Sequence, residues 1–269
     1  MGLYPLYSVG KSLTAMAVIA LGIDPASSLG DLADVPVPFR RMRLLDVLRH
    51  RAGLPDYGGW PEYRSAIADP HPWSYEELMD RAARATAPRV GDFHYSNVGY
   101  AIVRRIVEGR TERDFHGAIA AALLDPLGIE ETAPFAQLED WDVCVRTVPD
   151  VTWYHPGWVL TGTIASSPAA AEAVFAGVLA GELLDPSALL DAVPVDAPGF
   201  ALPQPGYALG LMTSGAPTPQ WVGHGGGGPG YANFVLAAAD GSAASAVFCA
   251  GVVDQNELVR RCMEDLDDH

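Results

Sequence analysis

The chain has 269 residues, of which 49% are hydrophobic and 19% charged, a composition typical of globular proteins rather than disordered or fibrous ones. Its 33 acidic and 17 basic residues give a formal charge of −16, so its overall field repels phosphate backbones and anionic lipid headgroups. We therefore expect no nucleic-acid partner and no membrane partner. The acidic excess is typical of a solvated surface and indicates no particular substrate.

Cysteine, histidine and hydropathy patterns indicate no metal, no cofactor and no targeting segment. The three cysteines lack C-x-x-C spacing, and the seven histidines never fall at a ligand spacing such as H-E-x-x-H. The apolar stretch Leu13–Leu21 is far shorter than the ~20 residues that a bilayer span needs. It also lacks the flanking features of a signal peptide, so we expect a cytoplasmic protein, or a periplasmic or secreted one if the true start lies upstream.

In chain order, the first two thirds of the sequence predict a helix-rich region. Val9–Leu21 is apolar on nearly every face and is followed by Gly22, which is typical of a helix buried on all sides. Ser74 and Glu77 have the spacing of a capping box. Further helices are predicted over Leu44–His50, Tyr75–Thr86, Val98–Glu108, Glu112–Leu124 and Pro168–Leu184.

The last quarter changes to short strands separated by Gly, Pro, Asp and Ser, and a final amphipathic helix is predicted over Gln255–Leu266. The predicted strands are Tyr207–Met212, Gln220–His224, Tyr231–Ala238 and Ala243–Val253, with a hairpin at Asp240-Gly241. Consecutive strands joined by tight turns favour an α+β fold, in which an antiparallel sheet is flanked by helices. We expect one domain over 1–269, with a mostly helical part at 23–190. The sheet, the first helix and the last helix come from 1–22 and 200–269.

A single lysine is the most informative feature of the sequence. Lys11 is the only lysine, and all other basic residues are arginine. A buried amine can lose its proton and act as a base, whereas arginine stays charged. Ser8 lies three residues earlier, so the two side chains share a helix face near a helix N-terminus, as an activated serine nucleophile requires. The alternative is a surface lysine beside a helix that Ser8 caps.

Two further motifs accompany this pair. Residues 93–100 (FHYSNVGY) place the phenol of Tyr95 and the carboxamide of Asn97 on one short loop before a helix. A phenol can pass protons if its surroundings stabilise the phenolate. The run 223–231 (GHGGGGPGY) ends one predicted strand and begins another, and its glycines indicate a backbone that something approaches closely. A strand rather than a helix follows it, which excludes a dinucleotide site. The absence of a G-x-S-x-G motif argues against the nucleophile elbow of an α/β-hydrolase.

With these elements in this order, the sequence resembles the serine β-lactamase and penicillin-binding-protein-like family, especially its class C β-lactamase, D-alanyl-D-alanine carboxypeptidase and esterase branch. The matching stretches span nearly the whole chain. They are 8–15 (SVGKSLTA), 45–57 (LDVLRHRAGLPDY), 93–108 and 224–231. The resemblance implies a β-lactamase/transpeptidase-like fold and catalysis without a cofactor.

The resemblance also implies roles for individual residues. Ser8 would be the acylated nucleophile, with Lys11 and Tyr95 as the proton-transfer pair. Asn97 would bind a substrate amide or orient the lysine, and His224 would stand where relatives carry Lys or His. The backbone N–H groups of Ser8 and Gly227 would form an oxyanion hole, in which each donor is worth on the order of 3 kcal/mol. The predicted substrate-binding set is Asn97, His224, Gly225, Gly226 and Gly227.

The sequence departs from the family pattern at two places. Relatives carry Thr or Ser after the Lys or His of the strand, where a hydroxyl helps to hold a substrate carboxylate, and here that residue is Gly225. This favours an uncharged ester. Relatives also place several dozen residues before the nucleophile, so either the true start lies upstream or the sheet lacks the usual N-terminal strands. Such a sheet exposes an edge, which predicts a homodimer that covers it.

The leading hypothesis is a serine acyl hydrolase that forms an acyl-enzyme with a small-molecule ester, amide or β-lactam, as an esterase, β-lactamase or D-Ala-D-Ala carboxypeptidase does. One alternative is a non-catalytic, penicillin-binding-like binding or regulatory module, because a fold alone does not establish activity. Another is that only the fold is shared, with Tyr95 and His224 as packing residues.

Overall fold

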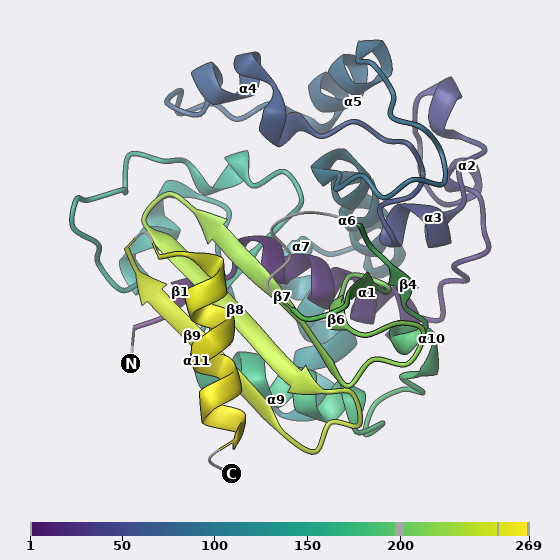
Figure 1. Cartoon of the computed structure of the whole chain (residues 1–269). Coiled ribbons are helices and arrows are strands. Elements are labelled where there is room, and N and C mark those ends of the chain that lie inside the picture. The colour runs from purple at the N-terminus through teal and green to yellow at the C-terminus, as the bar shows by residue number, and fades with distance from the viewer. Residues whose placement is uncertain (1, 197–201, 252, 268–269) are drawn as a thin grey trace.

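The structure, a computed structural model, describes residues 2–196, 202–251 and 253–267. Its largest feature is a six-stranded antiparallel sheet in the order β4-β5-β6-β7-β8-β9, seen from one face in Figure 1. The strands are β4 (Val193–Pro194), β5 (Pro205–Tyr207), β6 (Met212–Ser214), β7 (Trp221–Gly228), β8 (Tyr231–Ala238) and β9 (Ala244–Ala250). This arrangement confirms the predicted α+β class with an antiparallel sheet flanked by helices.

The alternation of side chains along β8 buries both faces of the sheet. Phe234 and Leu236 pack with Leu258 of α11 (Gln255–Asp267) on one face. Val235 and Ala237 belong to the main core on the other face, together with Val174 of α9 (Pro168–Leu179). Because successive residues of a strand point to opposite faces, an apolar run in which almost every residue is buried fits a central strand between two helical layers.

The helical part of the chain lies beside β7, the strand that contacts α1 (Figure 1). Its helices are α1 (Gly10–Ala20), α2 (Leu29–Leu32), α3 (Leu44–Leu48), α4 (Pro61–Ala66), α5 (Tyr75–Arg84), α6 (Asn97–Thr111), α7 (Phe115–Ile119), α8 (Asp125–Leu127) and α10 (Ser187–Leu190). A second, three-stranded sheet has the order β1 (Tyr4–Pro5), β3 (Ile164–Ser166) and β2 (Thr132–Pro134). The predicted capping box at the start of α5 is present, with Ser74 and Glu77 bonded reciprocally.

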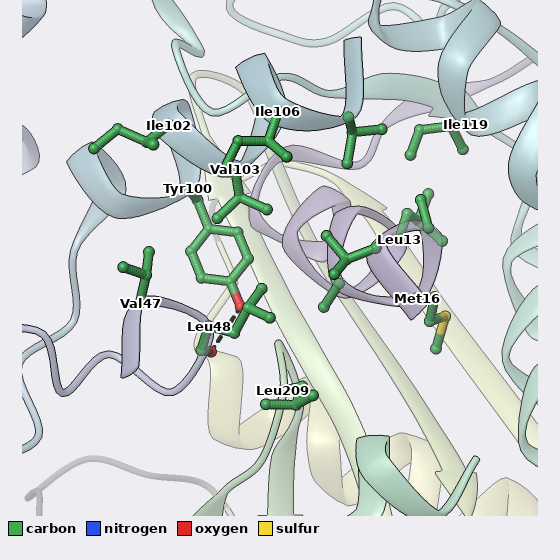
Figure 2. Packing of buried hydrophobic residues seen from close by; sticks show 14 of the residues in the cluster. Leu13, Met16, Val47, Leu48, Tyr100, Ile102, Val103, Ile106, Ile119 and Leu209 are labelled. Atoms are coloured by element: carbon green, nitrogen blue, oxygen red, sulfur yellow. Dashed lines mark hydrogen bonds between the residues drawn. The ribbon is translucent and has the colours of Figure 1, made fainter. Parts of the chain in front are cut away.

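Helix α1 lies at the centre of the core, as its apolar sequence predicts. Figure 2 shows Leu13 and Met16 of α1 surrounded by side chains of α3, α6 and α7. Tyr100 of α6 packs in the same cluster, and its hydroxyl donates a hydrogen bond to the carbonyl of Leu48 at 2.8 Å. The helix therefore has little freedom to move, which fixes whatever its N-terminal end carries.

Several predicted boundaries are wrong, and each error has a local cause. The strand predicted over Tyr207–Met212 is not continuous: Tyr207 ends β5, Met212 begins β6, and the residues between them form a turn in which Gly210 adopts a φ of 69°. The helix predicted over Glu112–Leu124 is interrupted, since α6 runs on to Thr111 and Glu112 caps it in the left-handed region at φ 55°. After that break come α7 and one turn of π-helix over Ala120–Leu124.

The remaining differences are at element ends. The helix predicted to reach Leu184 ends at Leu179. The strand predicted over Gln220–His224 continues as β7 through Gly228. The strand predicted over Ala243–Val253 is β9, which ends at Ala250, and Val252 lies outside the described residues.

Candidate active site

Ser8 lies in a 3₁₀ turn, Tyr7–Val9, that leads directly into α1. Lys11 is the second residue of α1 and is only 1% exposed, yet its Nζ lies 3.0 Å from Ser8 Oγ, to which it donates a hydrogen bond. The N-cap of α1 is Val9, without a side-chain cap. The alternative of a surface lysine next to a serine N-cap is therefore wrong.

The surroundings of Lys11 favour an amine that gives up its proton near neutral pH. The Nζ atom lies 5.0 Å from the ring centroid of Tyr95 and 5.8 Å from that of Tyr100. Burial lowers the pKa of Lys11 to about 7, and the charge of Asp56 opposes part of this shift. A neutral amine in hydrogen-bond contact with a serine hydroxyl is able to accept its proton.

Tyr95 reaches the same serine from the loop before α6. Its hydroxyl hydrogen-bonds to Ser8, which lowers the pKa of the phenol, but burial is the larger influence and raises that pKa well above its usual value. Ser8 thus meets an amine from its own helix and a phenol from a segment 87 positions later in the chain. The protonated phenol is suited to donating a hydrogen bond, whereas the amine is suited to accepting a proton.

Asn97, the first residue of α6, is held by a carboxylate that sequence reasoning missed. Oδ1 of Asp56 accepts from the backbone N–H of Asn97 at 3.0 Å and from its Nδ2 at 2.8 Å. The same oxygen accepts from the backbone N–H of Gly58. The Nδ2 contact fixes the orientation of the Asn97 carboxamide, so its Oδ1 and the second Nδ2 hydrogen remain for other partners.

The glycine run forms the C-terminal end of β7 rather than a loop. A Cβ at Gly226 would overlap the carbonyl oxygen of Leu6, and one at Gly228 would overlap the ring of Tyr7. The close approach predicted from the glycines is therefore present, and the approaching element is the turn that carries Ser8. Gly227 is exposed to solvent and lines two cavities together with Ser8.

His224 belongs to the same strand and is buried, and both of its ring nitrogens have a hydrogen-bond partner. Its Nδ1 lies 2.6 Å from the carbonyl oxygen of Gly225 and its Nε2 lies 3.2 Å from the hydroxyl of Tyr207. Burial lowers the pKa of His224 to about 3, and the neighbouring Lys11 adds to the shift. The ring is thus neutral and only 1% exposed.

The two cavities at Ser8 measure about 260 Å³ and 250 Å³. The first is walled by aromatic side chains that include Tyr57, Tyr63 and Tyr154. The second contains Tyr95, His224 and a residue that sequence reasoning missed, Gln255 of α11. Its side chain occupies the space above Gly225, and its Nε2 donates to the carbonyl of Gly226 at 3.1 Å.

Two further observations on the described residues concern metal binding and membrane-spanning helices. Among residues 2–196, 202–251 and 253–267, no three His, Cys, Asp or Glu side chains lie close enough to hold a metal ion. In the same described part of the chain, none of the helices combines the length and apolar character that crossing a bilayer requires.

The chain is similar to known proteins in sequence and in fold. The sequence profile of the family described as Beta-lactamase matches residues 2–261. Penicillin-binding protein 4* of Bacillus subtilis (strain 168) is 28% identical over 138 residues, which cover 48% of this chain but only 30% of that protein.

Two solved structures share the fold across the chain. The D-amino acid amidase from Ochrobactrum anthropi SV3 complexed with L-phenylalanine has a TM-score of 0.81 at 20% identity and covers 99% of this chain and 84% of its own. A D-stereospecific amidohydrolase from Streptomyces sp. has a TM-score of 0.77 at 20% identity, with 98% and 86% covered.

Proposed function

The chain belongs to the beta-lactamase family, and on that premise we propose that it is a serine acyl hydrolase that cleaves an ester or amide through an acyl-enzyme. The observation that carries the proposal is the contact of Ser8 Oγ with the buried Lys11 Nζ at 3.0 Å, together with the hydrogen bond between Ser8 and Tyr95. A nucleophile, a base and a second proton carrier therefore meet at one oxygen.

The reaction then proceeds in two halves. Ser8 Oγ attacks the carbonyl carbon of the substrate while the neutral amine of Lys11 takes the hydroxyl proton. The resulting tetrahedral intermediate collapses, the bond to the leaving group breaks, and a proton that passes from Lys11 by way of Tyr95 neutralises the departing alkoxide or amine. Water attacks the acyl-enzyme in the same manner, which releases the carboxylic acid and restores Ser8.

The negative oxygen of the intermediate needs hydrogen-bond donors. We assign this role to the backbone N–H groups of Ser8 and Gly227, because the two residues line the same two cavities and the glycine strand packs directly on the turn that carries Ser8. Donors of this kind are held in place before the reaction, so they stabilise the transition state without reorganisation.

The lining of the cavities supports an uncharged acyl group. No arginine lines either cavity in the described part of the chain, and the only lysine is buried behind Ser8. The neutral ring of His224 and the carboxamide of Gln255 stand where a cation or a hydroxyl would hold a carboxylate. A neutral ester or amide therefore fits better than a β-lactam or a peptide that carries a carboxylate at this place.

The test is covalent labelling. The protein is incubated with a fluorophosphonate, a series of p-nitrophenyl esters, an amino acid amide, nitrocefin and a D-Ala-D-Ala peptide, and adducts are sought by intact mass. We expect an adduct on Ser8 and release of p-nitrophenol, both absent in Ser8→Ala and present in the control Ser12→Ala.

Failure of every ester and amide to react would contradict the proposal. Tight ligand binding without an adduct would instead identify a non-catalytic binding module. Faster turnover of nitrocefin than of any ester would overturn the preference for an uncharged substrate.

We also propose that the open edge of the sheet pairs two copies of the chain. Within the described residues β9 has a strand partner on one side only, β8, although the side chain of Glu172 accepts the outward N–H of Ala246 at 2.8 Å. An edge of this length presents backbone groups that a second edge satisfies. Light scattering at micromolar concentration should give the mass of a dimer, and a monomer would contradict this assignment.

A further inference from the structure

A chain of buried hydrogen bonds runs behind the candidate active site and links four separate segments: the loop before α6, the residue His50 after α3, β5 and β7. The backbone N–H of Ser96 donates to Nδ1 of His50 at 3.0 Å. Nε2 of His50 lies 3.1 Å from the hydroxyl of Tyr207, which lies 3.2 Å from Nε2 of His224. Nδ1 of His224 lies 2.6 Å from the carbonyl oxygen of Gly225. His50, Tyr207 and His224 are each at most 2% exposed.

The two ends of this chain determine where its protons lie. A backbone N–H can only donate, so Nδ1 of His50 carries a lone pair and its Nε2 carries the proton that is donated to Tyr207. A carbonyl oxygen can only accept, so Nδ1 of His224 carries a proton, and in the neutral ring Nε2 is an acceptor. The hydroxyl of Tyr207 accepts from one imidazole and donates to the other.

One further group competes for the hydroxyl proton of Tyr207. Tyr100 hydrogen-bonds to Tyr207, but its own proton is donated to the carbonyl of Leu48 at 2.8 Å, as drawn in Figure 2. Tyr100 therefore offers Tyr207 only an acceptor. If His224 carried a positive charge, Tyr207 would turn its proton to Tyr100. Burial and the proximity of Lys11 disfavour that charge, so the neutral arrangement holds.

The position of this chain connects it to the reacting groups. The ring of His50 lies 4.4 Å from that of Tyr95 and the ring of His224 lies 6.2 Å from it, measured between centroids, so both imidazoles pack near the phenol. The other end of the chain holds the carbonyl of Gly225, two residues before Gly227 on the same strand. A change in the chain would therefore displace the phenol and the glycine strand relative to Ser8.

We propose that Tyr207 is a positioning residue for the reaction, because its hydroxyl, held by His50, fixes His224 as the neutral Nδ1–H tautomer and so holds Tyr95 and the glycine strand in place beside Ser8. This inference rests on the proposed acyl transfer. It also changes the sequence-based expectation for His224, whose ring nitrogens are both engaged within the protein, so that it supports the substrate site without binding the substrate through them.

The first test needs no variant and no activity. Long-range ¹H–¹⁵N correlation spectra of the protein labelled with ¹⁵N-histidine distinguish a ring nitrogen that bears a proton from one that bears a lone pair. With resonances assigned through bonds from the backbone, we expect a proton on Nε2 of His50 and on Nδ1 of His224, unchanged between pH 5 and pH 8. The opposite tautomer at either residue, or a His224 that titrates in this range, would overturn the proposal.

The second test separates positioning from packing. Tyr207→Phe keeps the ring and removes only the hydroxyl. The matched control is Tyr75→Phe, which removes a hydroxyl bonded to the carbonyl of Asp34, at a residue that lines neither cavity at Ser8. We expect kcat for a p-nitrophenyl ester to fall on the order of 10- to 100-fold in Tyr207→Phe, because misplacement of reacting groups acts on the transition state. KM should stay within about threefold, the His224 signals should shift, and the control should match the wild type.

The outcomes distinguish this inference from the function on which it rests. Wild-type kcat in a folded Tyr207→Phe, or a loss confined to KM, would overturn the positioning role while leaving acyl transfer intact. If Tyr207→Phe does not fold, the wild-type tautomers decide. If the wild-type protein forms no adduct on Ser8, acyl transfer fails, and the spectra still test whether the chain of hydrogen bonds exists.

Discussion

Helix α1 has a polar N-terminal stretch and an apolar stretch further along, and the residues of both are fully buried. Towards its C-terminal end, Met16, Ala17 and Val18 are fully buried among apolar side chains, part of which Figure 2 shows. At its N-terminal end, Lys11 and Ser12 are also fully buried but polar. One stretch of helix therefore contributes burial of apolar surface, and the other holds groups whose burial costs free energy.

Each polar group at the N-terminal end has a specific partner. Lys11 donates to Ser8, and Ser12 donates to the carbonyl of Gly210 at 2.6 Å. These contacts offset part of the free energy lost when the groups are removed from water, but burial still lowers the pKa of the Lys11 amine to about 7. Burial of the apolar stretch therefore stabilises the fold and offsets the free energy that burial of the Lys11 amine costs. Such a cost is common where a site needs a perturbed pKa.

The largest expected effect comes from removing the amine. Lys11→Met keeps the length of the side chain and eliminates the base, so kcat/KM for a p-nitrophenyl ester should fall by about 10³-fold or more. The same variant should be more stable than the wild type at pH 7, by on the order of 1 to 4 kcal/mol in urea unfolding. Retained activity, or a loss of stability, would remove the contrast between the two ends of the helix.

The pH dependence of that stability difference has a definite sign. The pKa of Lys11 is about 7 in the folded protein and about 10.4 in an unfolded chain, so between these values the unfolded state binds more protons. Stability of the wild type should therefore rise with pH through this window, and its deficit relative to Lys11→Met should shrink by pH 10. A difference that stays constant from pH 7 to pH 10 would show that the amine is not buried in this way.

A truncation in the apolar stretch of α1 should lower stability and leave activity unchanged. Met16→Ala leaves a cavity in the core and should lower the free energy of unfolding by about 2 to 5 kcal/mol. Since Met16 is more than a helical turn from Lys11, the folded fraction should keep its kcat and KM. Chemical denaturation measures the free energy of unfolding, and kinetics below the unfolding transition measure kcat and KM. A tenfold loss of kcat in folded protein would contradict the separation of stability and activity between the two stretches of α1.

Ser12→Ala should have a smaller effect on stability. The substitution leaves the buried carbonyl of Gly210 without its donor, which costs about 1 to 3 kcal/mol. Ser12 contacts neither Ser8 nor Tyr95 among the hydrogen bonds of the described residues, so esterase activity should persist. Thermal unfolding followed by circular dichroism provides the measurement, and an unchanged midpoint would mean that water satisfies the carbonyl.

The smallest expected effect sharpens the electrostatic part of the comparison. Asp56 raises the pKa of Lys11, so Asp56→Asn should lower it and move the acid limb of kcat/KM to lower pH by up to about one unit. The other titratable groups facing Lys11 are His50, His224, Tyr95 and Tyr100. Burial keeps all four uncharged in this range. A limb that moves to higher pH would contradict the assignment of Lys11 as the base.

The sequence reached the local parts of the site and missed the distant ones. Ser8 and Lys11 were found because one helical turn joins them, and Tyr95 and Asn97 because they share a short motif. Tyr207 and Gln255 gave no signal, and Asp56 was not singled out within the matching stretch 45–57, since each acts on a partner at least 17 residues away. The glycine run indicated a close approach but not which element approaches.

By itself, the sequence determined the α+β class, the buried first helix and the pairing of Ser8 with Lys11, because helix periodicity, strand alternation and motif spacing are local properties of the chain. Only the tertiary structure decided that Lys11 is dehydrated, that Tyr95 reaches Ser8 and that both nitrogens of His224 are engaged. Protonation and tautomer depend on burial and on partners from several segments, and folding alone brings those together.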